Sequence, residues 1–231
     1  RDSETWLEFR RVLFRSIADV GIFLQKKRYV IHILDDEGIP CDKFKYTGVE
    51  VVRSTMPGAI KPYVKKIIET MLMSQNIGET NKVLNETYDI FKGLSPEDIT
   101  FVSGIKGYEK YAGQCDGFST AKGMPLHVKA AYIHNLLLDR FNIATKYEKI
   151  SSGDKVRFFY VKEPNKYNVS AIAYKYYYPD EFKNAFEPDY DTMFEKHIFS
   201  VVDRFYQNVN WVAQKPGNLV QTNLFDLLSW L

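Results

Sequence analysis

The stretch that most constrains the fold is Gln25–Leu34, in which three consecutive cations and a tyrosine lead into an alternating apolar run. As a β-strand it would place the odd-numbered residues of Tyr29–Ile33 on one face and the even-numbered residues of Val30–Leu34 on the other. Cations at the entrance of a rigid strand are held at defined positions, so they can meet a polyanion in a fixed register. The alternative is that Lys26–Arg28 simply form a solvated strand end.

An acidic turn and a second extended segment follow this strand. Residues 35–38 are Asp-Asp-Glu-Gly, which predicts a turn. The segment Lys43–Arg53 then alternates in such a way that Lys43, Lys45 and Arg53 share one face. The next residues, Ser-Thr-Met-Pro at 54–57, are typical of a helix start.

Beyond residue 54 the apolar spacing becomes mainly helical. One helix either begins near Lys61 or is kinked at Pro62, and a second ends at Gly93. Two further helices begin after Met124-Pro125 and at Pro188. Short strands are predicted at 99–103, 144–150, 155–161 and 169–174, with a long loop at 104–123. The predicted fold class is therefore α+β.

Size and composition leave several classes of protein open but exclude others. The 231 residues can form one large or two small domains, and 45% hydrophobic with 26% charged residues describe an ordinary soluble protein. Because the net charge is only +2, a nucleic-acid partner must be argued from where the cations lie. No apolar run is long enough to span a bilayer, no signal-peptide pattern occurs, and the two cysteines form neither a disulfide framework nor a zinc pattern.

Taken in order, the motifs between residues 26 and 57 resemble the family B replicative DNA polymerases, most closely those of T4-like bacteriophages. The matching elements are Lys-Lys-Arg-Tyr at 26–29, Asp-x-Glu-Gly at 35–38, Lys-x-Lys-x-x-Gly-x-Glu at 43–50 and the helix start at 54–57. A weaker likeness continues through 123–129, which resembles a thumb segment that ends Pro-Phe-His-Ile-Arg. Lys129 stands there in place of the usual arginine, so the charge is kept without the bidentate fork.

The resemblance implies a division of the chain into the end of a palm domain, a thumb and a tail. Residues 17–53 would be a two-stranded palm remnant, 54–207 a mainly helical thumb with a small antiparallel β-element, and 208–231 a connector and tail. Residues 1–16 do not match the two-aspartate palm motif expected at that position. We interpret them as a translated sequencing adapter, with a genuine amphipathic helix as the alternative.

The same resemblance implies the chemistry of the parent protein, which is template-directed addition of deoxynucleotides to a primer. Two Mg²⁺ ions would serve that reaction, held by palm aspartates that this chain does not contain, so the chain alone is expected to bind DNA without polymerising. The expected location is the cytoplasm of an infected bacterial host.

Primer–template duplex DNA is the partner that the resemblance assigns to the cations. Lysine and tyrosine donors can probe the minor-groove acceptors of every base pair, and spaced cations release counterions from phosphates. The groove-side residues would be Lys26, Lys27 and Tyr29, with Arg28 in the same cluster. Backbone contacts would come from Lys45, Arg53 and Lys129, for which a solvated surface charge is an equally good interpretation.

The C-terminal tail carries a second functional signal. Its Gln-x-x-Leu-Phe pattern resembles sliding-clamp-binding peptides, and a short apolar anchor after a flexible connector can dock in a partner's pocket. The predicted anchors are Gln221, Leu224, Phe225, Leu227 and Leu228. The alternative is a terminal helix that packs on the thumb.

Two rival functions remain open at this point. A metal-dependent nuclease or other hydrolase could use Asp35, Asp36 and Glu37, although adjacent strand residues point to opposite faces and a plain turn is favoured. A non-enzymatic interaction module is the other rival. No catalytic constellation is found. The four histidines are scattered along the sequence at positions His32, His127, His134 and His197. Packed core positions are expected for His134 and His197.

Overall fold

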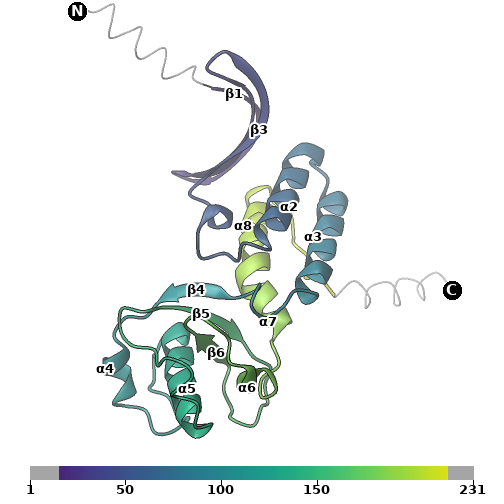
Figure 1. Cartoon of the computed structure of the whole chain (residues 1–231). Helices are drawn as coiled ribbons and strands as arrows, with labels where there is room; N and C mark the ends of the chain where they lie inside the picture. The colour runs from purple at the N-terminus through teal and green to yellow at the C-terminus, as the bar shows by residue number, and fades with distance from the viewer. Residues whose placement is uncertain (1–15, 218–231) are drawn as a thin grey trace, which may run out of the picture. The chain divides into compact units, whose positions relative to one another are not determined.

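A computed structural model describes residues 16–217, which form two compact units (Figure 1). Within the described residues, unit 1 comprises 16–53, 62–87 and 199–217, and unit 2 comprises 54–61 and 88–198. Each unit combines helices with one three-stranded antiparallel sheet. The α+β class expected from the sequence is confirmed.

The sheet of unit 1 has the order β1-β2-β3, with β1 at Ser16–Gln25, β2 at Arg28–Asp36 and β3 at Ile39–Thr47. The prediction of two strands was wrong, because Ser16–Gln25 pairs with β2 along most of its length. Alternation in β1 is interrupted by three register shifts, so its period is too irregular to identify from the sequence. An isolated two-stranded hairpin is only marginally stable in water, and three strands are the minimum for a sheet that is stable by itself.

The second predicted strand, Lys43–Arg53, is shorter than expected. It ends at Thr47, since Gly48 adopts a φ of 62° and turns the chain into the 3₁₀ turn η1 at Glu50–Val52. Arg53 therefore does not continue the alternating face of β3, and this part of the prediction was wrong.

The helices of unit 1 are α2 at Lys61–Ser74, the first part of α3 at Ile77–Lys92, and α8 at Ser200–Asn208. The α2 helix begins at Lys61, one of the two predicted alternatives, which places Pro62 in the first turn where a missing N–H costs nothing. Tyr46 of β3 ties α2 to the sheet, because its hydroxyl donates to Glu69 at 2.5 Å and its ring centroid lies 5.0 Å from Lys65 Nζ.

The sheet of unit 2 has the order β4-β5-β6, with β4 at Phe101–Gly104, β5 at Lys155–Tyr160 and β6 at Ala171–Tyr174. The predicted strand at 144–150 does not form. Its last residue, Ile150, instead exchanges two hydrogen bonds of 2.7 Å with the side-chain amide of Asn135. That amide satisfies the Ile150 backbone without a neighbouring strand.

The principal helix of unit 2 is α5 at Leu126–Arg140, which packs against β6. The helix predicted to open at Pro188 begins at Tyr190, where Asp189 accepts a hydrogen bond from the Thr192 amide. It then includes a π-helical turn. The remaining elements are α4 at Tyr108–Ala112, α6 at Asp180–Lys183, α7 at Tyr190–Phe194 and the π-helical η2 at Glu195–Phe199.

The core of unit 2 is rich in aromatic rings. Phe182 is fully buried, and its ring lies 5.6–6.2 Å from those of four neighbours. Those neighbours are His134, Phe141, Tyr178 and Phe186. Between residues 16 and 217, no helix has the length and apolar character needed to cross a bilayer.

Candidate nucleic-acid interface

Lys26 and Lys27 form the tip of the β1–β2 hairpin, and both side chains are exposed. Lys27 adopts a φ of 63°, a region that non-glycine residues rarely occupy. Gly48 packs directly against this tip, since a Cβ atom there would lie 2.2 Å from the Lys27 carbonyl oxygen. The two lysines thus lie on a turn that the neighbouring chain supports, rather than on a free strand end.

One face of the sheet next to the tip carries aromatic and cationic side chains. Tyr29 is paired with Phe23 of β1 and with Thr47 of β3, while Ile31 is paired with Lys45. The rings of Phe23 and Tyr29 lie 5.4 Å apart, and Phe23 is 64% exposed. Because pairing and alternation place all five residues on one face, Tyr29 and Lys45 can contact the same ligand.

Arg28 and Arg53 belong to a cluster around one carboxylate. Glu50 binds Arg28 through both of its oxygens, accepts from Arg204 of α8 at 2.8 Å, and lies 4.0 Å from Arg53. Burial alone would raise the pKa of Glu50, but its own backbone N–H and Arg28 outweigh that effect and hold the pKa below its usual value. Glu50 is therefore ionised at neutral pH.

The structure places six of the predicted DNA-contacting residues in unit 1 and one in unit 2. Lys26, Lys27, Arg28, Tyr29, Lys45 and Arg53 belong to unit 1. Lys129 lies in the first turn of α5 in unit 2, where it is half-buried. The clamp-binding residues Gln221, Leu224, Phe225, Leu227 and Leu228 lie outside the described part of the chain.

The acidic residues at 35–37 have structural roles in the β2–β3 hairpin. Glu37 and Gly38 form a two-residue turn with φ values of 59° and 83°, the pattern of a type I′ turn. Asp35 accepts from the Gly38 amide at 2.7 Å, and Asp36 accepts from Ser16 at 2.8 Å and from Lys43 at 2.6 Å. Among residues 16–217, no three His, Cys, Asp or Glu side chains are grouped closely enough to hold a metal ion.

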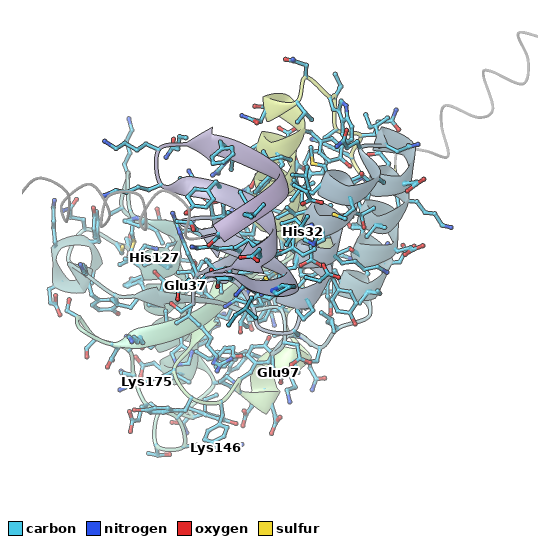
Figure 2. All side chains as sticks on the ribbon, turned by 90° about the horizontal axis from the view of Figure 1, so that it is seen from above. His32, Glu37, Glu97, His127, Lys146 and Lys175 are labelled. Atoms are coloured by element: carbon cyan, nitrogen blue, oxygen red, sulfur yellow. The ribbon has the colours of Figure 1, made fainter. Side chains whose placement is uncertain are left out.

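His32 of β2 has a role that the sequence did not indicate (Figure 2). Its Nδ1 lies 2.7 Å from Asp19 of β1, and its Nε2 lies 2.6 Å from Asp42 of β3. These hydrogen bonds, first to Asp42 and then to Asp19, outweigh burial and raise the pKa of His32. One side chain thus connects all three strands, and only a correct β1 register could have revealed it.

The other three histidines lie in unit 2. His134 is buried on α5, as predicted, and burial lowers its pKa to about 4. His197 lies with its ring centroid 3.8 Å from that of Phe101, and burial likewise lowers its pKa to about 4. His127 is half-buried, and burial lowers its pKa as well (Figure 2).

Comparison with known proteins identifies a family and a relative. The sequence model of DNA polymerase family B matches residues 7–209. A relative, the DNA-directed DNA polymerase of Escherichia phage RB69, is 28% identical over 156 residues. That alignment covers 67% of this chain but only 16% of the phage protein, so the chain spans a small part of the length of this relative.

Proposed function

The chain belongs to DNA polymerase family B, and from this premise we propose that unit 1 holds the primer–template duplex during template-directed addition of deoxynucleotides. The hairpin tip Lys26–Lys27 and the face that carries Tyr29 are the proposed contact surface. The observation that carries the proposal is the support of an exposed dicationic tip by Gly48, beside an aromatic pair in which Phe23 is exposed and Tyr29 is half-buried.

The chemistry of this surface fits a duplex held without regard to sequence. Every base pair presents acceptors in the minor groove, and a lysine ammonium or a tyrosine hydroxyl can donate to them. A fixed tip loses little conformational entropy when it binds, in contrast to lysines on a free loop. Lys45, on the same face as Tyr29, is proposed to meet the phosphate backbone, as is Lys129 in unit 2.

Mg²⁺ serves the reaction of the proposed parent enzyme, but the carboxylates described here do not fit a two-metal site. Asp19 and Asp42 bind His32 from opposite sides, and Asp36 is paired with Lys43. A pair of catalytic metal ions needs converging carboxylates that are free to ligate them. The chain alone is therefore proposed to bind DNA without extending a primer.

The placement of this chain within the parent protein is part of the same proposal. Residues 17–53 are proposed as the end of the palm, 54–207 as the thumb, and 208–231 as a connector with a clamp-binding tail. The likeness to a phage polymerase supports a T4-like parent that acts in the cytoplasm of an infected bacterium.

Binding of the full chain to a fluorescent primed hairpin DNA, followed by anisotropy over a range of salt concentrations, tests the proposal. The double variant Lys26→Gln/Lys27→Gln should bind about tenfold more weakly at 0.1 M salt, because it removes two cationic donors to the minor groove. The matched control is Lys66→Gln/Lys82→Gln, which removes two exposed lysines from α2 and α3 of the same unit.

The control should retain both the affinity and the salt slope of the parent chain. Equal behaviour of the two double variants would refute the proposed role of the hairpin tip. Primer extension by the chain with Mg²⁺ and deoxynucleotides would contradict the second part of the proposal.

A further inference from the structure

Three arginines from three separate segments of unit 1 surround Glu50. Arg28 comes from the start of β2, Arg53 follows η1, and Arg204 lies on α8. Sequence separation hides this arrangement, since Arg204 is 154 positions from Glu50. The cluster carries two positive charges in excess of what Glu50 neutralises.

The cluster holds more hydrogen-bond donors than Glu50 can accept. Arg28 engages both carboxylate oxygens and is mostly buried, with 19% of its side chain exposed. Arg204 adds one bond to a single oxygen, while Arg53 contributes a 4.0 Å ion pair and a 3.4 Å hydrogen bond to the Gly48 carbonyl. Each guanidinium has five N–H donors, so most donors of Arg53 and Arg204 remain for a ligand.

The two arginines with spare donors are also the accessible ones. The side chain of Arg53 is 52% exposed and that of Arg204 is 47% exposed. Glu50 orients both arginines, and the cluster keeps its two excess positive charges. Glu50 lies only two positions after Gly48, which packs on the Lys27 carbonyl. The cluster is thus adjacent to the proposed DNA-binding tip.

We propose that Arg53 and Arg204 together bind one phosphate of the duplex backbone, with Glu50 as the positioning residue. This inference rests on the proposed function and adds a residue from α8 to the DNA contacts. The planar fork of arginine matches two phosphate oxygens, and a phosphodiester supplies the acceptors that the cluster lacks. A phosphate bound there would fix the position of the duplex whose minor groove the tip enters.

The test measures duplex binding of the full chain over a salt series for Arg204→Gln, Arg53→Gln and Arg204→Lys. Each glutamine variant should lower the slope of log affinity against log salt, by at most about 0.9, the loss expected for the single phosphate that the two arginines share. Arg204→Lys should keep the slope but bind more weakly than the parent chain, because it retains the charge without the fork. Lys82→Gln, an exposed lysine of α3 in the same unit, is the control and should change neither quantity.

A purely structural role for Arg204 would shift the thermal midpoint of the free chain without changing the salt slope. Arg53→Gln keeps the test valid if Arg204→Gln does not fold, since its contact with Glu50 is the longest of the three. Unchanged slopes in the folded glutamine variants overturn the inference. If Lys26→Gln/Lys27→Gln still weakens binding in that case, only the phosphate site is lost. If the tip variant also has no effect, the proposed function falls with it.

Discussion

The histidines of the two units show how differently the units are stabilised. His32 in unit 1 lies between two carboxylates on neighbouring strands, so its charged form is favoured. His134 in unit 2 lies against the ring of Phe182, and burial favours its neutral form. The difference teaches that polar and ionic contacts connect the strands of the unit 1 sheet, whereas buried apolar and aromatic side chains hold the sheet of unit 2.

This contrast follows from how much of each sheet is exposed to solvent. The sheet of unit 1 leaves Phe23 exposed and Tyr29 and Lys45 accessible on one face, so it can bury less apolar area per strand. Ion pairs and the His32 contacts compensate for this smaller buried area, because they connect strands that have one solvent-exposed face. In unit 2, every residue of β6 is buried, and the sheet needs no such connections.

The largest expected effect is on the aromatic core. Phe182→Ala should lower the free energy of unfolding by about 3–5 kcal/mol, since it removes a fully buried ring with four aromatic neighbours. Phe23→Ala in unit 1 should change it by only about 0.5 kcal/mol, because Phe23 is 64% exposed. Urea unfolding of the two variants checks the pair, and comparable losses would show that the exposed ring of Phe23 stabilises unit 1 as much as the buried ring of Phe182 stabilises unit 2.

The next effect concerns the support of the hairpin tip. Gly48→Ala should cost about 2–4 kcal/mol, since φ is 62° there and the new Cβ would meet the Lys27 carbonyl at 2.2 Å. Gly38→Ala is the matched control, with a φ of 83° and no atom within 4 Å of the added carbon. It should cost only about 1 kcal/mol.

Thermal unfolding of both glycine variants, together with duplex binding, separates strain from steric conflict. Gly48→Ala should also weaken DNA binding under conditions where the variant is folded, while Gly38→Ala should not. Equal costs for the two substitutions would show that the tip does not depend on the close approach of Gly48.

Local patterns predicted those elements whose signals lie within a few residues. The strand after Lys-Lys-Arg-Tyr and the Asp-Asp-Glu-Gly hairpin turn were found this way, as were the helices near Lys61 and after Pro125. The predictions failed where a long-range partner decides the structure. The β1 strand depends on pairing with β2. Residues 144–150 do not form the predicted strand, because the side chain of Asn135 binds the backbone of Ile150.

The candidate site divides in the same way. Lys26, Lys27 and Tyr29 are adjacent in sequence, so the motif identified them together. Arg204 has no local signal, since its relation to the site consists of one contact across the unit. His32 was noted only as an isolated histidine, because neither its β1 partner strand nor the bulge near Asp19 was predicted.

The two units should also respond to pH with opposite sign. His32 has a raised pKa in the folded chain, so its contribution is fully present below about 6.5 and is lost as pH rises through the folded value. His134 and His197 have pKa values of about 4, so the unfolded chain binds protons that the folded chain does not, and stability falls as pH drops from about 6.5 to about 4. Protection from amide hydrogen exchange, corrected for the intrinsic pH dependence of the exchange rate, should therefore fall in β1–β3 at alkaline pH and in α5 and β5 at acidic pH. His32→Gln should abolish the alkaline change alone, since glutamine cannot supply the charged double donor; a wild-type alkaline response in that variant would assign the response to another group.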